Sequence, residues 1–279
     1  MPNSETGEKP VYVHMGAKAK SELVDIIKDN KKAMRMLQRL ETDEYVQGIL
    51  EQANTVVVGR MGYNDHGLTH SRIVARNALT VLKLLSKAGI QPNIVKERVG
   101  SYEDAEVIVM TAAYIHDMGN SIHREIHYAH TVALVGNFLD SALGELFGKE
   151  RKRMARLKAA TLEAVYSHDE AVEAISVEGG CVKVGDGGDM ACGRARVPFS
   201  KGKKDIHSIS ALAIDDVKIV KGEEKPVRIE VNMSCSAGIF QIQNVLGGKI
   251  RTSSIKQYIE VVGVVNAKDK DQIFDRIEL

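Results

Sequence analysis

The chain has 279 residues, of which 44% are hydrophobic, enough for a sizeable core in one large domain or in one large and one small domain. Its formal net charge is +1, so no overall field attracts nucleic acid or an acidic membrane surface. Aromatic residues make up only 5% of the chain and tryptophan is absent, which argues against a base-stacking platform for single-stranded nucleic acid.

The cysteines and the lengths of the apolar runs favour a cytoplasmic location. Cys181, Cys192 and Cys235 are odd in number and widely spaced, so neither disulfides nor a thiolate zinc site is expected. The N-terminus is polar, and no apolar run is long enough to cross a membrane. We therefore expect a cytoplasmic protein that has no membrane partner.

The first third of the chain reads as helices with one β-prone interruption. Residues 1–16 form a lead-in, in which Val11–Val13 could add a short strand, and residues 17–54 carry apolar stripes at helical spacing. Residues 55–60 are β-prone. A helix to about Lys87 then follows, with Asn64 or Asp65 as its N-cap and His70 on its first turn.

The middle of the chain predicts the central helix. A capping box at Ser101–Asp104 begins a segment that is apolar nearly all round and ends at the adjacent pair His116–Asp117. The next helix is approached through His123, His127 and His130, whose spacings of four and three place them near one face. A further helix leads into His168, and the glycine-rich segment at 182–189 presents Asp186 from a helix or tight turn.

The pattern changes after about residue 205. Residues 227–233 alternate strictly between apolar and polar side chains, as do residues 217–219, and both segments are predicted strands. The prediction is a mainly α protein: a lead-in at 1–16, a helical domain at 17–200 and a small α+β domain at 201–279. The last of these is also where we expect a homodimer contact.

Six side chains at the ends of predicted helices form a candidate metal set. Imidazole and carboxylate are good ligands for divalent metals, and helical bundles build such sites from inward side chains of several helices. Six ligands suit two ions, with Asp117 placed to bridge them. The imidazole content favours Mn, Fe, Co, Ni or Zn over Mg. The set is His70, His116, Asp117, His127, His168 and Asp186.

Each of the other polar residues near these ligands could have either a structural or a functional role. Taken singly, His66, His123 and His130 are core or cap histidines, as are His14 and His207, although His130 and then His123 stand behind His127 as the middle ligand. Phosphate-binding cations are expected among Arg124, Lys183, Arg194 and Arg196, with surface ion pairs as the other reading. Asp169 and Asp189 are placed to orient ligand imidazoles, or are turn residues.

The ordered set resembles the HD superfamily of metal-dependent phosphohydrolases. The likeness rests on His70 in His-Ser-Arg-Ile-Val-Ala, on His116-Asp117-Met-Gly and on Asp186 in Lys-Val-Gly-Asp, and it covers roughly residues 60–200. His127 and His168 are similar to the extra histidines of two-metal members of the HD-GYP type. The chain departs from that type at Asn120, where those enzymes have lysine, and at His66, where they have glutamate. The GYP signature is absent as well, which argues against hydrolysis of cyclic dinucleotides.

The resemblance implies an all-helical HD bundle and a two-metal phosphohydrolase, with an α+β appendage like that of some archaeal-type HD proteins. In this reading a metal-bridging hydroxide attacks a nucleotide or another small phosphorylated compound, and a third metal at His66 stays open. Catalytic roles fall to His116, Asp117, Arg124 and Lys183. Two alternatives remain: a di-iron oxygenase that uses the same six ligands, and a non-catalytic sensor or scaffold.

Overall fold

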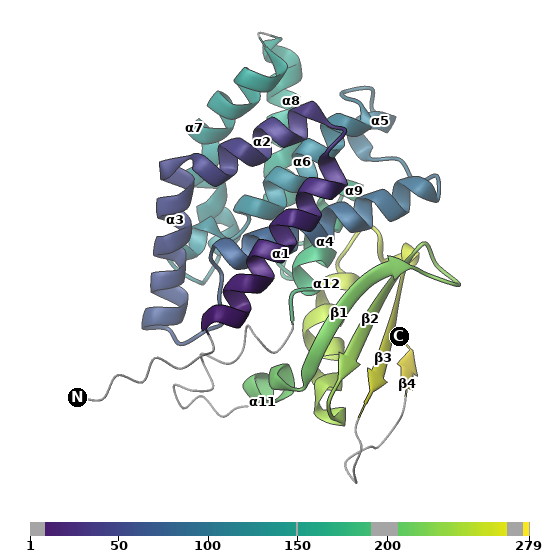
Figure 1. Cartoon of the computed structure of the whole chain (residues 1–279). Coiled ribbons are helices and arrows are strands. Elements are labelled where there is room, and N and C mark those ends of the chain that lie inside the picture. Colours follow the sequence, from purple (N-terminus) through teal and green to yellow (C-terminus); the bar gives the residue numbers. More distant parts are fainter. Residues whose placement is uncertain (1–8, 149, 191–205, 267–275, 279) are drawn as a thin grey trace, which may run out of the picture.

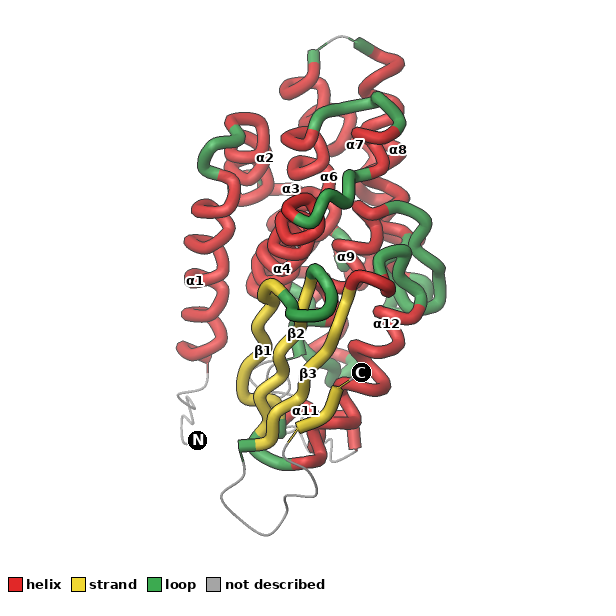
Figure 2. Tube along the Cα trace, turned by 90° about the vertical axis from the view of Figure 1, so that its right-hand side faces the viewer, coloured by secondary structure: helices red, strands yellow, loops and turns green. Residues whose placement is uncertain are grey.

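The computed structural model describes residues 9–148, 150–190, 206–266 and 276–278. The protein is mainly α, with a small four-stranded sheet near its C-terminus, as predicted. Figure 1 shows the helices gathered above the sheet, and Figure 2 shows the strands from the side. No helix within the described part of the chain is long and apolar enough to cross a membrane.

The helical part contains α-helices together with short π- and 3-10 segments. The α-helices are α1 (Lys9–Ile27), α2 (Lys31–Thr42), α3 (Glu44–Asn54), α4 (Leu68–Lys87), α5 (Asn93–Lys96), α6 (Tyr102–Ile115), α7 (His127–Phe147), α8 (Arg151–Tyr166) and α9 (Val177–Gly187). A π-helix, Thr55–Arg60, follows α3, and a 3-10 turn, Met118–Ser121, follows α6.

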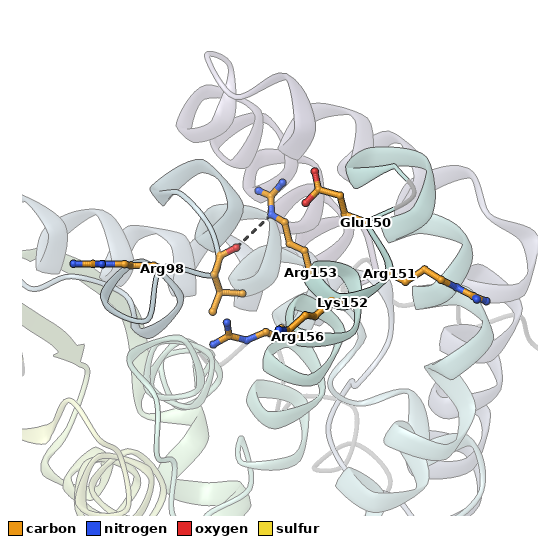
Figure 3. A pocket seen from close by; sticks show the side chains of 7 residues that line it. Arg98, Glu150, Arg151, Lys152, Arg153 and Arg156 are labelled. Atoms are coloured by element: carbon orange, nitrogen blue, oxygen red, sulfur yellow. Dashed lines mark hydrogen bonds between the residues drawn. The ribbon is translucent and has the colours of Figure 1, made fainter.

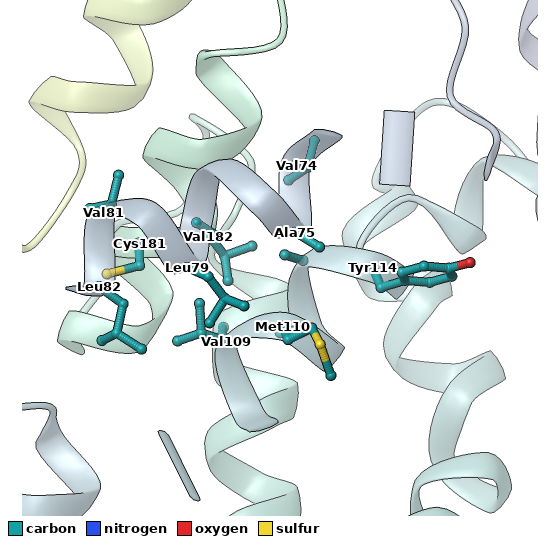
Figure 4. Close-up of a cluster of buried hydrophobic side chains, with 14 of the residues drawn as sticks. Val74, Ala75, Leu79, Val81, Leu82, Val109, Met110, Tyr114, Cys181 and Val182 are labelled. Carbon is teal, nitrogen blue, oxygen red and sulfur yellow. The ribbon is translucent and has the colours of Figure 1, made fainter. Parts of the chain in front are cut away.

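Helices α4, α6 and α9 form the centre of the bundle. Helix α4 packs against α1, α6 and α9, and α6 is buried along nearly its whole length. Figure 4 shows where these helices meet: Leu79 and Leu82 of α4 lie beside Val109 of α6 and Val182 of α9. Because the C-terminal half of α6 is apolar nearly all round and fully buried, its end lies inside the protein and carries His116 and Asp117 into the core.

Three local predictions were wrong. Residues 11–13 belong to helix α1 and form no strand, and the β-prone residues 55–60 form a π-helix. Valines that favour strands were overridden here by helical packing, since Val56 and Val57 are buried. Helix α4 begins at Leu68 with Gly67 in the N-cap position.

Asp65, one of the two predicted caps, has another role. Its carboxylate accepts hydrogen bonds from the Gly67 N–H at 3.2 Å and from the Asn54 side chain at 2.5 Å. The capping box at Ser101 and Asp104 is confirmed, with each side chain bonded to the other residue's backbone N–H.

The C-terminal part is built on strands β1 (Ile214–Lys221), β2 (Val227–Met233), β3 (Ile259–Val265) and β4 (Arg276–Glu278), preceded by α11 (Ile206–Leu212). The strands lie in that order, and β2 pairs parallel with β3 while the other pairs are antiparallel. The apolar residues of β2 are buried alternately, as predicted. The predicted boundary at residue 200 lies outside the described residues and stays a prediction.

A parallel pair of strands cannot be joined by a tight turn and needs a long connection. Here β2 and β3 are joined by a crossover that holds a 3-10 turn (Ser236–Gly238), a π-helix (Gln241–Leu246), α12 (Gly247–Arg251) and a second 3-10 turn (Lys256–Tyr258). The π-helix and α12 both contact α9. The crossover therefore joins the sheet to the helical part.

The turn between β1 and β2 is held by a single carboxylate. Glu260 on β3 accepts the backbone N–H groups of Glu223, Glu224 and Lys225 at 2.9–3.1 Å and the Arg228 guanidinium at 2.5 Å. Burial alone would raise its pKa, but these donors lower it from an ordinary 4.5 to about 2. The ionised carboxylate is thus a structural part of the hairpin.

We predict that the hairpin loosens in acid. Because the folded pKa of Glu260 is depressed, its contribution to stability is fully present above about pH 4.5 and is lost as the pH falls toward 2. Amide hydrogen exchange at residues 223–225 should accelerate over that interval, after correction for the intrinsic rate. In a Glu260→Gln variant the exchange should be fast already at pH 6. Equal protection in the variant and the wild type at pH 6 would contradict the assignment.

Candidate metal centre

The C-terminal end of α6 delivers His116 and Asp117 into the core. His116 is in the C-cap position, and its carbonyl accepts a hydrogen bond from Thr131 of α7 at 2.8 Å. Gly119 allows this close packing, because a Cβ atom there would collide with the backbone carbonyl of His127. Asn120 then donates to the Asp117 carboxylate at 2.8 Å. The 3-10 turn after α6 is therefore clamped against the start of α7.

Five imidazoles contact the carboxylate of Asp117: His66 does so through Nδ1, and the other four are each held from behind through Nδ1. His70 places Nδ1 2.6 Å from the carboxylate of Asp189, and the other three face backbone carbonyl oxygens. When Nδ1 carries the proton and donates it, Nε2 is left with a lone pair. The three carbonyl contacts are His116 to Ala113 at 2.8 Å, His127 to Arg124 at 3.0 Å, and His168 to Val165 at 2.6 Å.

The two oxygens of Asp117 face two different groups of imidazoles. Oδ2 lies 3.2 Å from Nε2 of His70 and 3.3 Å from Nε2 of His116. Oδ1 lies 3.2 Å from Nε2 of His127 and 3.8 Å from Nε2 of His168. We call the first group, together with Asp186, the first half-site, and the second group the second half-site. One carboxylate is shared between them.

Asp186 completes the first half-site. Its Oδ1 atom lies 3.3 Å from Nε2 of His70 and 3.7 Å from Nε2 of His116. The second half-site has Asp169 at its edge, with Oδ2 4.0 Å from Nε2 of His127. His66 approaches from outside, with Nδ1 2.5 Å from Oδ2 of Asp117. The six predicted ligands are therefore brought to one centre.

The donor chemistry of this cluster fits divalent cations. The Nε2 atoms of His70 and His116 are 3.2 Å apart, and those of His127 and His168 are 2.9 Å apart. With the Nδ1 protons of these four imidazoles donated outward, such pairs of lone pairs repel one another unless a proton or a metal cation lies between them. All six predicted ligands are at most 8% exposed, so water cannot screen that repulsion. Neutral imidazole and ionised carboxylate are also the forms that bind metal.

The pKa values agree with that requirement for His168, Asp117 and Asp186. His116 differs: burial alone would lower its pKa, but the carboxylates of Asp117 and Asp186 raise it above its ordinary value, so a metal would displace a proton there. Burial and the positive charge of neighbouring groups hold the pKa of His168 well below its ordinary value, so this imidazole is neutral. Burial alone would raise the pKa of Asp117, but the neighbouring His116 and His66 hold it well below its ordinary value. Burial alone would also raise the pKa of Asp186, but the positive charge of Lys249 holds it well below its ordinary value, so this carboxyl is ionised as well.

Several predicted residues are placed differently. Lys183 uses all three ammonium protons on backbone and hydroxyl oxygens of Val172 and Thr252, so it has none left for a phosphate. Its predicted catalytic role does not fit this geometry. Arg124 does reach the centre, with one guanidinium nitrogen 3.4 Å from Nε2 of His127. Arg194 and Arg196 lie outside the described residues.

Among the three competing histidines, the structure brings in only His127. His123 is exposed and accepts a hydrogen bond from the backbone N–H of Glu125, while His130 is partly exposed on α7. Asp189 holds His70 from behind, as expected of a carboxylate that orients an imidazole. Asp169 instead lies on the Nε2 side of His127, where ligands are found.

Lys249 of α12 is a member of the centre that sequence reasoning missed. Its ammonium lies 2.5 Å from Oδ2 of Asp186 and donates to the backbone carbonyl of His168 at 3.0 Å. The residue is 63 positions beyond Asp186, in a segment without a histidine or other chemical signal. The one indication in the sequence is the adjacent pair Gly247–Gly248, because glycines allow the backbone to pack closely against another part of the protein.

A basic surface cavity lies elsewhere on the helical part. It measures about 480 Å³ and is lined by Arg98 and by the first turns of α8, including Arg151, Arg153 and Arg156. In Figure 3 Arg98 and Arg151 extend to opposite sides, and Arg153 turns to the carbonyl of Val99. Arg153 is also paired with the buried carboxylate of Asp104 at 2.6 Å. These cations do not converge on a common point, unlike the buried cluster.

Comparison with known proteins gives one relative. The chain is 45% identical over 234 residues to a protein of Methanocaldococcus jannaschii described as "uncharacterized protein MJ1020", and the match covers 84% of this chain and 89% of that protein. No protein-family model and no solved structure matches the chain.

We predict that cation binding depends on Asp117 and is graded between the half-sites. Wild-type protein should bind about two cobalt ions and Asp117→Ala about none, while His116→Ala and His127→Ala should each bind about one, because each loses only one half-site. Stoichiometry is read by elemental analysis after gel filtration. His123→Ala is the matched control and should bind like the wild type. Unchanged loading in Asp117→Ala would contradict the shared carboxylate.

Proposed function

Since the chain belongs to the family of the M. jannaschii protein MJ1020 and gathers five imidazoles around one buried carboxylate, we propose that it is a two-metal phosphohydrolase of the HD type. Its substrate would be a nucleotide or another small phosphorylated compound. The order of the ligands along the chain and their convergence in space both support the resemblance to the HD superfamily.

The observation that carries the proposal is the division of Asp117 between the two half-sites. Oδ2 faces His70 and His116, while Oδ1 faces His127 and His168. A carboxylate in this position can hold two cations side by side. When bound, such a pair supplies Lewis acidity toward a phosphoryl group and lowers the pKa of water. The high imidazole content favours Mn, Fe, Co, Ni or Zn over Mg.

The chain's own polar groups define the side from which a substrate enters. The side chain of Arg124 is 34% exposed and that of Asp169 is 21% exposed, whereas the imidazoles between them are almost fully buried. Arg124 is also hydrogen-bonded to Asn120 at 3.3 Å, which aims its guanidinium at the second half-site. We assign to Arg124 the binding of phosphoryl oxygens, for which a guanidinium is well suited.

A cytoplasmic compartment is also part of the proposal. Among the described residues, Cys181 and Cys235 are not joined by a disulfide, and this is compatible with a reducing compartment. The homodimer through the C-terminal part and the absence of nucleic-acid partners stay predictions.

The same imidazole-rich, carboxylate-bridged set would also suit a pair of iron ions that activate dioxygen. The test is a panel of nucleoside mono-, di- and triphosphates, cyclic nucleotides and generic phosphodiesters, run with each metal, beside an oxygen-uptake assay with iron. We expect phosphate release that disappears in Asp117→Ala. Oxygen uptake without hydrolysis would favour the oxygenase. Bound metal without either activity would favour a sensor or scaffold, and hydrolysis that survives the loss of Asp117 would contradict the scheme.

We predict a separate effect for Arg124. Arg124→Ala should lower kcat/KM by roughly 10²-fold, the usual cost of losing one donor to a developing negative charge, and leave the metal stoichiometry unchanged. Arg151→Ala, at an exposed arginine of the first turn of α8, is the control and should behave like the wild type. If Arg124→Ala retains wild-type kcat/KM on the best substrate, the guanidinium does not contact the phosphoryl group.

A further inference from the structure

The crossover between β2 and β3 brings a cation to the metal centre. Lys249 is in the middle of α12, and its side chain is only 15% exposed. Its stem packs on Gly187 at the end of α9, where a Cβ atom would lie 3.3 Å from Cδ of the lysine. The ammonium passes this glycine and reaches the outer edge of the first half-site.

The two oxygens of Asp186 have separate partners. Oδ2 lies 2.5 Å from the ammonium of Lys249, while Oδ1 faces Nε2 of His70 at 3.3 Å. A carboxylate can bind a metal through one oxygen or through both. Because Lys249 occupies Oδ2, only Oδ1 is presented to a cation in the first half-site.

The side chain of Lys249 also contacts the backbone of the second half-site. The ammonium donates to the carbonyl of His168 at 3.0 Å, and the Nδ1 atom of the same histidine faces the carbonyl of Val165. One side chain from the C-terminal part thus holds a carboxylate of the first half-site and the turn that carries an imidazole of the second.

The backbone around Lys249 is fastened to the helical part at the same place. The carbonyl of Thr252 accepts hydrogen bonds from the N–H of Ala174 at 2.9 Å and from Lys183 at 3.1 Å. The hydroxyl of Ser254 donates to the carbonyl of Ser176 at 2.5 Å. The buried Lys183, which has no role at the centre itself, therefore fixes the segment that carries Lys249.

We infer that Lys249 is a positioning residue of the metal centre, which keeps Asp186 bound through one oxygen and makes the C-terminal part a component of that centre. The inference rests on the proposed function only in requiring that the cluster hold metal; it does not require turnover. By this assignment the sheet and its crossover are part of the site. Cation binding at the first half-site and the order of α12 are therefore coupled, because the cation and Lys249 share the carboxylate of Asp186.

Cobalt spectroscopy tests the coordination directly, since the visible absorption of cobalt weakens as its coordination number rises. In Lys249→Met the freed Oδ2 of Asp186 can also coordinate the ion. The molar absorption of cobalt in the first half-site should therefore fall at least twofold. Lys256→Met is the matched control: the same change, in the same crossover, at an exposed lysine. It should reproduce the wild-type spectrum. Identical spectra for Lys249→Met and the wild type would overturn the inference.

A measurement on the wild-type chain avoids the risk that Lys249→Met fails to fold. Adding cobalt should change the rate of amide exchange at residues 247–252 at least fivefold, with little change at residues 222–225 in the β1–β2 turn. Equal exchange with and without cobalt at 247–252 would also overturn the inference. If cobalt binds and the spectra shift as expected but no substrate is hydrolysed, the proposed function fails while the role of Lys249 stands.

Discussion

The structure depends on one electrostatic constraint, the burial of the Asp117 carboxylate among five imidazoles. An ionised group that is moved out of water costs several kcal/mol unless opposite charge or hydrogen bonds compensate it. Asn120 supplies one hydrogen bond to Asp117, Nδ1 of His66 lies 2.5 Å from its Oδ2 atom, and the Arg124 guanidinium lies 3.9 Å away on the exposed side. The lone pairs of the imidazoles increase the negative potential at the centre, so the arrangement calls for cations. The residues around Asp117 hold the carboxylates and the imidazole lone pairs in positions where they can bind cations.

The helix ends meet this constraint by a recurrent local device. His116, His127 and His168 each point Nδ1 at the carbonyl oxygen three residues earlier in the chain. For His116 and His168 that carbonyl is in the last turn of a helix, where carbonyl oxygens have no partner within the helix. The imidazole satisfies the helix end, and the helix end fixes the proton on Nδ1. The same contact therefore ends a helix and prepares a ligand.

This device explains which parts of the site could be predicted from the sequence. The pair His116–Asp117 stands directly after the apolar helix α6, and His168 closely follows the end of α8, so their positions at helix ends were readable from the sequence. Their convergence was a hypothesis that rested on those positions and on the family resemblance. His127 could not be separated from His123 and His130 by spacing, because the choice depends on where α7 begins, and α7 begins at His127 after a residue, Ile126, with the positive φ of 50°. A β-branched residue rarely adopts that conformation, and no sequence rule anticipates it. Lys183 shows the opposite failure: it is close to the ligands in sequence, yet its ammonium is used by Thr252 of the crossover and by the carbonyl of Val172.

The fold of the C-terminal part follows from a local pattern, but its place in the site does not. Alternation identifies β2, and it says nothing of the partner of β2 or of the direction of pairing. The parallel pairing of β2 with β3 obliges the chain to leave the sheet and return to the same end, and this return passes over α9. The positive charge at the centre therefore comes from topology: Lys249 reaches Asp186 because two strands run in the same direction. An antiparallel β2–β3 pair could be closed by a short turn, and Asp186 would then have to be neutralised by another group or bind a cation through both oxygens.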